Sequence, residues 1–303
     1  MSRSLRLSHS ALKTLNLCER KFQLERILSG QKEHEDYPAT ILGKAWGAAV
    51  ASYFIYQDQD KAIYDLWLSY YPRLEDDVRT QEVAINMLVA SFSEIDSLLQ
   101  DWEVLHVEGK PAVELSFRLN LDSSYYFVGY VDIVLKNRYT GRAAVLDVKT
   151  TGLKLLDLSP VYQNSPQCIG YSIVLDQIMG EELSEYDVFY FSGQLGSGNG
   201  FSPIIKSYVF PKTLQDRLLW FISLGMDVKH LEDMASMNVY PQRGDNCLQY
   251  NKPCKHFGVC GLYGLDRPAE IEEDTTEYQF VFSLDEIIDN HVRRMPQQDE
   301  PVN

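Results

Sequence analysis

The spacing of apolar residues divides the first third of the chain into helical segments. Apolar side chains recur at helical spacing in residues 9–28, which predicts a helix there. Residues 30–40 are polar and contain a proline, so we expect a loop. Residues 41 to about 105 return to the helical pattern, are rich in aromatic side chains, and are interrupted near Pro72. We therefore expect an N-terminal third made of helices.

From Pro111 the apolar period changes to two, which is typical of strands. Three strands are expected in succession, and the five residues "NRYTG" supply a hairpin turn between the second and the third. Their residues are 112–119 ("AVELSFRL"), 125–136 ("YYFVGYVDIVLK") and 143–151 ("AAVLDVKTT").

The rest of the chain mixes both periods. Ser165 and Pro166 are expected to open a helix that runs to Gly180, with the serine as N-cap and the proline at the first helical position. Two strands, a long helix and a final short strand or helix follow, at residues 186–192, 204–210, 214–235 and 278–290. This order predicts an α/β or α+β core with a mixed sheet flanked by helices.

Composition places the chain among ordinary soluble proteins, with 45% apolar and 23% charged residues. The N-terminus lacks the apolar run of a signal peptide, and no segment approaches eighteen consecutive apolar residues, so we expect a cytoplasmic protein with no membrane contact. The net charge of −15 argues against nucleic acid as a partner, but it is unevenly distributed. Residues 266–303 hold 11 Asp and Glu against 3 Arg, for a net charge of −8.

Two strands carry acidic residues within apolar surroundings. Asp132 lies inside "GYVDIVL", and Asp147 and Lys149 lie two apart on the next strand, so both project from one face. A hairpin can bring Asp132 close to Asp147. Two adjacent carboxylates attract a hard divalent cation, and a nearby lysine can orient water and stabilise negative charge. This set is sufficient to hydrolyse a phosphodiester, although an Asp–Lys pair on an exposed strand is the plainer interpretation.

Three further residues favour the chemical interpretation. Glu114 on the preceding strand can face the same site. Gln167 and Tyr171 are four residues apart on the following helix and therefore share one face, although such a pair is also common on an ordinary helix surface.

Taken together, "GYVDIV", "LDVKTT" and "QCIGY" resemble the G-h-D, D-x-K and Q-x3-Y motifs of the RecB-like branch of the PD-(D/E)XK nuclease superfamily. The segment "LSHSALKTLNLCERKFQLERI" is similar to the N-terminal helix of that family. The resemblance covers roughly Leu7 to Gly261. It implies one nuclease domain at 1–265, with a helical insertion at 41–110 and a cysteine region at 240–262, followed by an acidic tail at 266–303.

The resemblance also implies roles for individual residues. Asp132 and Asp147 would be metal ligands for Mg²⁺ or Mn²⁺, with the Val148 carbonyl as a further ligand and Glu114 as the upstream acid. Lys149 would be the catalytic lysine. Gln167 and Tyr171 would position substrate or the network of the active site.

One position departs from the family pattern. The family often has a G-x3-H motif whose histidine joins the metal site, and here "LGKAWG" places Gly47 at the histidine position. The expected consequence is weaker metal binding. A glycine that permits close packing of a helix is the alternative interpretation of this position.

Three of the five cysteines, Cys247, Cys254 and Cys260, lie close together in "NCLQYNKPCKHFGVCG". They lack a fourth thiolate nearby, whereas zinc and iron–sulfur sites take four protein ligands. Zinc bound with His256 is one interpretation, although its spacing from Cys254 is tight, and three cysteines without metal is another. Cys168 is expected to be a buried helix residue.

Iron–sulfur members of the family take one cysteine from the N-terminal helix and three from near the C-terminus. By that resemblance Cys18 is the fourth ligand of a [4Fe–4S] cluster that joins the two ends of the nuclease fold.

The resulting hypothesis is a metal-dependent DNA nuclease, most similar to CRISPR-associated adaptation nucleases and phage-type exonucleases. DNA, single-stranded or with free ends, is the implied substrate, and a recombination or CRISPR adaptation protein is the implied partner. A bacterial, archaeal or phage-infected cell is the implied setting. The alternative is a non-catalytic DNA-binding or assembly subunit that kept the fold.

Overall fold

A computed structural model describes residues 5–28, 37–71, 74–121, 124–155, 158–179, 183–195, 202–249, 252–262 and 274–294. The chain forms two compact units. Unit 1 comprises Met1–His34, Ser116–Gly129 and Leu218–Asn303, and unit 2 comprises Glu35–Leu115 and Tyr130–Arg217. Strands β5 (Val113–Asn120) and β6 (Tyr125–Asn137) and helix α9 (Leu214–Met237) each contribute residues to both units.

Unit 2 is built on a mixed sheet, as expected. Strand β7 (Ala143–Thr151) pairs antiparallel with β6 and parallel with β8 (Glu185–Gln194), and β8 pairs antiparallel with β9 (Ile204–Thr213). Strand β2 (Trp102–Val104) also pairs with β6, and β3 (His106–Val107) forms a small hairpin with β4 (Lys110–Pro111). The strands predicted in this part of the chain are confirmed.

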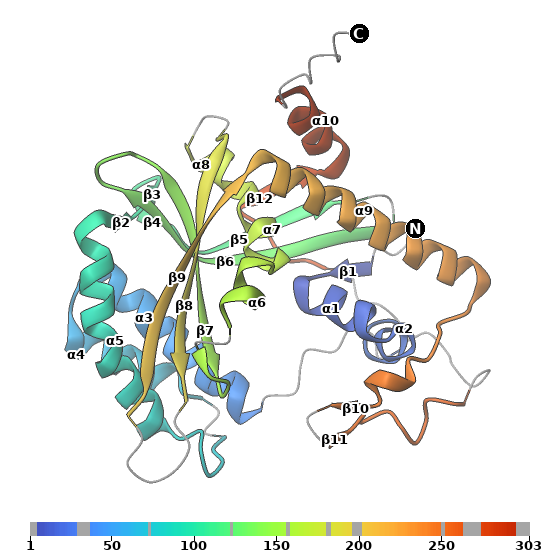
Figure 1. The fold of residues 1–303 in the computed structure, drawn as a ribbon, viewed down its shortest axis with the longest axis horizontal. Coiled ribbons are helices and arrows are strands. Elements are labelled where there is room, and N and C mark those ends of the chain that lie inside the picture. The colour runs from blue at the N-terminus through green and yellow to red at the C-terminus, as the bar shows by residue number, and fades with distance from the viewer. Residues whose placement is uncertain are drawn as a thin grey trace. The chain divides into compact units, whose positions relative to one another are not determined.

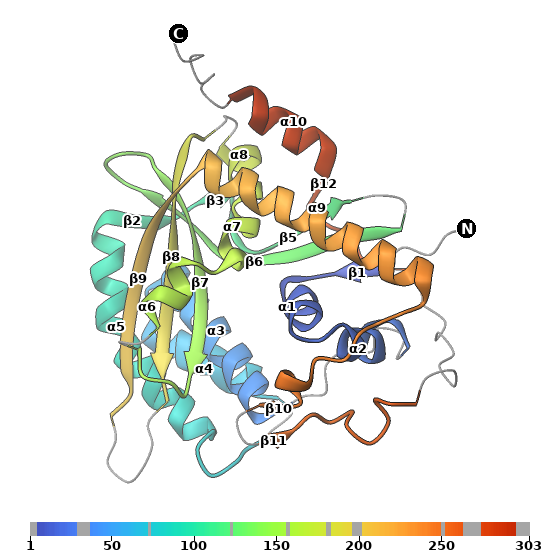
Figure 2. The ribbon, with the colours of Figure 1, turned by 45° about the vertical axis from the view of Figure 1, so that its right-hand side comes forward.

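Helices cover both faces of this sheet (Figures 1 and 2). On one face lie α3 (Pro38–Tyr56), α4 (Gln59–Ser69) and α5 (Gln81–Asp101), whose apolar side chains share a buried core with the strands. Trp46 of α3 stacks on Phe191 of β8 with ring centroids 5.7 Å apart. On the other face lie α6 (Ser159–Gln163), α7 (Pro166–Tyr171) and α8 (Ile173–Met179).

The alternation of side chains along β7 sorts its residues between these two layers. Ala144 and Leu146 belong to the core under α3 and α5. Asp147 and Lys149 therefore project towards α6 and α7. The side chains of Asp147 and Lys149 thus lie on the face of the sheet that the two short helices cover.

Unit 1 joins the N-terminal and C-terminal segments. Strand β1 (Leu5–Leu7) pairs in parallel with the start of β6, and β12 (Phe280–Ser283) pairs in parallel with the end of β5. The other elements are α1 (His9–Leu17), α2 (Glu19–Phe22), π-helix η1 (Gln23–Ile27), 3-10 helix η3 (Gly244–Asn246), β10 (Leu248–Gln249), β11 (Lys252–Pro253) and α10 (Leu284–Arg294). The short strand and the helix considered for residues 278–290 are thus both present.

The structure differs from the expected elements in three places. The helix at 9–28 is interrupted at Cys18, whose backbone is extended with φ −167° and ψ 112°. The helical region expected at 41 to about 105 ends earlier, at Asp101 of α5, because Trp102 takes extended geometry and pairs with β6. The helix from Ser165 divides into α7 and α8 at Ser172. No helix among the described residues has the length and hydropathy to cross a membrane.

Candidate functional site

The predicted acidic pair meets where β6 and β7 separate. Described pairing of the two strands begins with Ile133 opposite Leu146, directly beside Asp132 and Asp147. The backbone N–H of Val148 donates to Asp132 Oδ2 at 2.8 Å. The Asp132 side chain thereby ties the two strands together at the point where their ladder ends.

Lys149 and Gln167 both contact the Asp147 carboxylate. Lys149 Nζ donates to Asp147 Oδ1 at 2.9 Å and lies 2.7 Å from Oδ2, and Gln167 Nε2 lies 3.1 Å from Oδ1. Gln167 Nε2 also donates to the Tyr171 hydroxyl at 3.0 Å. Ser165 caps α7 by accepting from the Gln167 N–H, as the sequence predicts. The structure therefore brings four of the predicted site residues into one connected network.

Asp147 is the most deeply placed member of this network, with 1% of the residue exposed. Its Oδ2 is buried and, despite the nearby Lys149 ammonium, accepts no hydrogen bond of good geometry. A buried carboxylate oxygen with an unused lone pair is a suitable ligand for a hard cation. Asp147 Oδ2 can therefore serve as one ligand of the divalent metal that the family resemblance implies.

Glu114 is the third acidic residue predicted for the site, and its charge affects Asp132. It takes a left-handed φ of 51° inside β5, which is uncommon for a residue with a side chain and often marks a functional position. It is open to solvent, yet the surrounding protein reduces its hydration and raises its pKa. The Glu114 carboxylate also raises the pKa of Asp132.

Burial raises the pKa values of both aspartates, and the charge of Asp147 further raises that of Asp132. Burial first and the Asp147 charge second bring the pKa of Asp132 to about 7, against the opposing effects of Lys149 and the Val148 N–H. Burial also raises the pKa of Asp147. Burial alone would lower the pKa of Lys149, but the Asp147 and Asp132 carboxylates outweigh it and raise that pKa. A divalent cation would relieve the repulsion between the carboxylates.

The predictions made for Gly47 and Cys168 can be compared with the structure. A Cβ added at Gly47 on α3 would meet no atom within 4 Å, so close packing does not explain this glycine. Cys168 is fully buried on α7, which confirms its expected place in the helix.

As the side chains stand, no three His, Cys, Asp or Glu residues in the described part of the chain are close enough to hold one metal ion.

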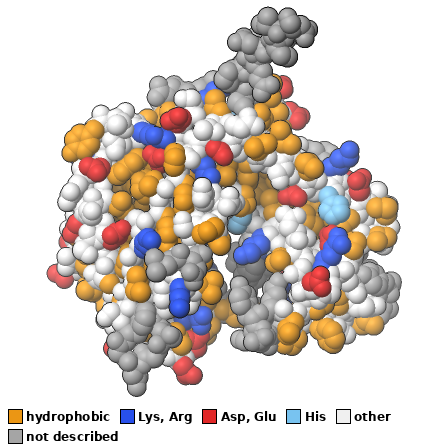
Figure 3. Space-filling model, in the orientation of Figure 1, with side chains coloured by type: hydrophobic (Ala, Val, Ile, Leu, Met, Phe, Trp, Pro, Cys, Tyr) orange, Lys and Arg blue, Asp and Glu red, His pale blue; other side chains and the backbone are white. Residues whose placement is uncertain are grey.

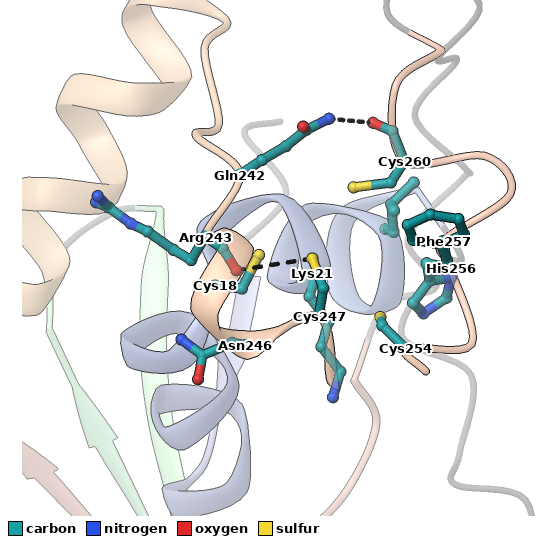
Figure 4. Close-up of a pocket in the computed structure, with 11 residues that line it drawn as sticks. Cys18, Lys21, Gln242, Arg243, Asn246, Cys247, Cys254, His256, Phe257 and Cys260 are labelled. Carbon is teal, nitrogen blue, oxygen red and sulfur yellow. Dashed lines mark hydrogen bonds between the residues drawn. The ribbon is translucent and has the colours of Figure 1, made fainter. Parts of the chain in front are cut away.

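Unit 1 contains a pocket lined by all four predicted cluster cysteines, Cys18, Cys247, Cys254 and Cys260. Their thiols point towards one space in Figure 4. Burial raises the pKa of Cys260, and charge on the other three cysteines raises it further, whereas Arg20 lowers it. The four thiols are therefore close enough to interact electrostatically.

Arg20 fastens the N-terminal helix to the segment that carries Cys260. The side chain is completely buried, with Nε donating to the Cys260 carbonyl at 3.1 Å and Nη2 to the Leu262 carbonyl at 3.2 Å. Gln242 Nε2 donates to the same Cys260 carbonyl at 2.9 Å (Figure 4). The sequence around Arg20 does not reveal this role, because "ERKF" has the charge pattern of a helix surface.

Further contacts hold the break at Cys18 against the C-terminal segment. The Arg20 backbone N–H donates to the Pro241 carbonyl at 3.0 Å, and the Asn246 side chain donates to the Leu17 carbonyl. The Glu19 carboxylate is buried and pairs with Arg243. Backbone groups freed by the interrupted helix thus find partners more than two hundred residues away, which explains how the break is stabilised.

His256, the ligand considered for zinc, lines the same pocket but has another contact. Its Nε2 lies 3.2 Å from Glu25 Oε1. Its ring is therefore engaged with a carboxylate of the N-terminal segment.

Comparison with known proteins gives a family match over most of the chain and matches to solved structures. The family model described as the PD-(D/E)XK nuclease superfamily matches residues 6–261. No curated protein matches the chain. Among solved structures, a "Putative exonuclease" from Eubacterium rectale is 14% identical, with 85% of this chain and 94% of that chain covered and a TM-score of 0.48. The protein SSO0001 is also 14% identical, with 78% and 90% covered and a TM-score of 0.24.

Proposed function

Because the chain belongs to the PD-(D/E)XK nuclease superfamily, we propose that it is a Mg²⁺- or Mn²⁺-dependent DNA exonuclease of the cytoplasm. The observation that carries this proposal is the buried Asp147 carboxylate. It contacts both Lys149 and Gln167 and keeps one oxygen without a hydrogen bond.

Each residue of the network has a part in hydrolysis. Asp132, Asp147 and Glu114 would hold the cation, with the Val148 carbonyl as a further oxygen. The cation supplies Lewis acidity at the scissile phosphate and a lower pKa for water. Lys149, whose ammonium contacts Asp147, would orient the attacking water and offset the charge that develops on the phosphate. Gln167 fixes the Asp147 carboxylate, and Tyr171 fixes Gln167.

The acidic composition does not oppose a DNA substrate. On the face shown in Figure 3, basic and acidic side chains are interspersed, so the net charge of −15 does not produce one continuous acidic surface there. Local attraction to phosphates depends on the charges near the site rather than on the total.

A structural [4Fe–4S] cluster bound by Cys18, Cys247, Cys254 and Cys260 is the second part of the proposal. It is supported by a pocket that presents four thiols, which is the ligand number that such clusters take. The four thiols supply this ligand number without His256. Closure of the long loop between Cys18 and Cys247 would stabilise the fold by several kcal/mol, on the order of a disulfide.

The catalytic proposal is tested with end-labelled single-stranded and double-stranded DNA in the presence of Mg²⁺ or Mn²⁺. We expect wild-type protein to release short products from DNA ends. Asp147→Ala and Lys149→Ala should abolish this while the fold persists, whereas Asp187→Ala, which alters a carboxylate outside the network, should cleave normally. Cleavage at the wild-type rate by either network variant would show that the site is wrongly assigned.

The cluster proposal is tested separately by anaerobic purification. We expect brown protein with about four iron and four sulfide per chain. Cys18→Ser should lose colour and thermal stability together, and Cys168→Ser should keep its colour. Colourless, zinc-loaded protein would overturn the proposal of a [4Fe–4S] cluster. It would not affect the catalytic proposal, which the DNA cleavage assay tests.

A non-catalytic DNA-binding subunit is the second candidate, favoured by glycine at position 47. Wild-type protein that binds DNA in the presence of Mn²⁺ but never cleaves it would support that role. A partner protein from recombination or CRISPR adaptation is compatible with both the catalytic and the non-catalytic proposal.

A further inference from the structure

Helix α4 carries an apolar stripe on its outer surface. Tyr64, Trp67 and Leu68 lie at positions i, i+3 and i+4, and Tyr71 follows the helix end. Their exposed fractions are 58%, 49%, 51% and 81%. The Tyr64 and Trp67 rings stack with centroids 6.3 Å apart. We call these four residues the α4 stripe.

The stripe is separate from the face by which α4 joins the core. That face consists of Ala62 and Leu66, which are fully buried against α3 and α5, with Tyr70 at the helix end. A surface helix needs one apolar face to pack on its domain and is normally polar elsewhere. Here the helix has a second apolar face, so packing within unit 2 does not account for the stripe.

The residue types of the stripe are those that dominate binding energy at protein interfaces. Tryptophan and tyrosine are enriched among interface hot spots, because they bury a large rigid area at low cost in side-chain entropy. Contiguous exposed apolar surface on a soluble protein commonly marks an interaction site. The i, i+3, i+4 spacing is that of a helix docked against an apolar surface of another protein.

Acidic residues outnumber basic ones in the part of the chain that carries the stripe. Residues 56–79 include six Asp and Glu against three Lys and Arg. Exposed Asp60 lies one turn before Tyr64. At the other end, the Tyr70 hydroxyl donates to the Arg79 carbonyl at 3.2 Å, and the charges of Glu75 and Asp76 add to burial in raising the pKa of Tyr70.

Basic side chains described in this region are already paired. Lys61 Nζ lies 2.9 Å from Asp65, and Arg79 Nη1 lies 2.7 Å from Asp76. A stacking surface for single-stranded DNA needs basic side chains beside its aromatic rings to attract phosphates. An aromatic stripe within an acidic border instead complements an apolar surface with a basic border.

We propose that the α4 stripe is the docking surface for a partner protein that presents an apolar patch bordered by Lys and Arg. The interaction is distinct from the chemistry at Asp147. It would tether the nuclease to an assembly without covering the acidic site.

The test uses full-length protein and a synthetic amphipathic helix of leucine and lysine as the probe, with a leucine and glutamate helix as the charge control. Binding is measured by fluorescence anisotropy for wild type and for a variant with Tyr64→Ser, Trp67→Ser and Leu68→Ser. Because these side chains are exposed, the variant should fold, which circular dichroism checks. A variant with Val89→Ser and Val209→Ser, two exposed valines of unit 2, is the matched control.

We expect the lysine helix to bind wild type and the valine control alike. The stripe variant should lose about tenfold or more in affinity, which is ~1.4 kcal/mol. Replacing Asp60 and Asp77 with lysine should also weaken binding, and the glutamate helix should not bind.

Four outcomes would overturn the proposal. One is absence of binding to the lysine helix, and another is equal binding by the stripe variant, which would reduce the effect to general attraction by an acidic protein. A wild-type dimer in sedimentation equilibrium that the stripe variant dissociates would make a second copy the occupant. Oligothymidylate binding that the stripe variant abolishes would make the stripe a nucleic-acid surface.

Discussion

Arg20→Met tests whether one buried guanidinium holds the two ends of the chain together. The wild-type side chain is completely buried and donates to the carbonyls of Cys260 and Leu262. Methionine keeps the apolar stem and removes both bonds, together with the hydrogen bond that Arg20 Nη1 donates to the Gln23 side chain within the same helical segment. We expect the segment 252–262 to open more readily from the N-terminal helices, with no effect on unit 2.

The magnitude follows from the contacts. Two hydrogen bonds from a charged donor contribute about 1.5–3 kcal/mol each, or about 3–6 kcal/mol together. Part of this is retained, because Gln242 still donates to the Cys260 carbonyl at 2.9 Å. Removing a buried charge also relieves a desolvation penalty of several kcal/mol. The net loss of local stability should be about 2 kcal/mol, which corresponds to a roughly 30-fold larger opening constant.

Amide hydrogen exchange on metal-free protein measures this opening directly, because local stability sets the protection of each segment. Peptides covering 252–262 should exchange roughly 30-fold faster in Arg20→Met, at the opening free energy derived above. Lys21→Met is the matched control, since Lys21 is the neighbouring cation and lines the same pocket. Wild-type exchange rates in a folded Arg20→Met protein would refute the reasoning. The measurement does not depend on any bound cluster.

Three other predictions concern separate parts of the fold. Gly47→His should fold, because a Cβ there meets no atom within 4 Å. The added histidine should lower the Mn²⁺ concentration needed for half-maximal cleavage. An unchanged Mn²⁺ titration would show that position 47 does not face the metal. Gly193→Ala should lower the free energy of unfolding by about 1–3 kcal/mol in denaturant titrations, because its Cβ would press on Met87 and lie 3.1 Å from Trp46. Unfolding at the wild-type free energy would show that the Met87 and Trp46 side chains can move to accommodate the methyl group. Burial would raise the pKa of Asp274, but hydrogen bonds from one threonine and two tyrosines outweigh it and lower the pKa. The ionised Asp274 carboxylate therefore stabilises the folded protein fully above the unfolded pKa near ~4, and this stabilisation is lost as pH falls through the folded pKa. The melting temperatures of wild type and Asp274→Asn should differ at pH 7 and converge in acid. A difference that stays constant with pH would contradict the role given to these hydrogen bonds.

The face that carries Asp147 and Lys149 could be predicted from sequence because local rules determine it. Alternation places Asp147 and Lys149 on one side of β7, and the turn at 137–141 sets the register that brings Asp132 beside them. Ser165 fixes the start of α7 and hence the direction of Gln167. Each step depends on residues that are near in the chain or joined by one hairpin.

The contacts of unit 1 could not be derived in the same way. Arg20 lies in a run of charged residues that has the pattern of a solvated helix, and its partners are 240 and 242 residues away. The break at Cys18 has no proline or glycine to mark it, and backbone groups on either side of the break bond to Asn246 and Pro241. Long-range partners override local helix propensity here, and that information is absent from any short window of sequence.

The same long-range pairing changes the interpretation of the acidic C-terminal segment. Strand β12 pairs with β5, where Phe282 and Phe117 contact edge to face with ring centroids 6.5 Å apart. Residues 280–294 hold three acidic residues and two arginines, so this folded part contributes only −1 of the −8. A truncation near Pro268 would remove a strand and uncover Phe117 as well as remove charge. Any change in DNA affinity would then combine a folding effect with an electrostatic one. Substituting amides for exposed Asp285 and Glu286 on α10 preserves the strand, so it isolates the charge effect, which salt should screen.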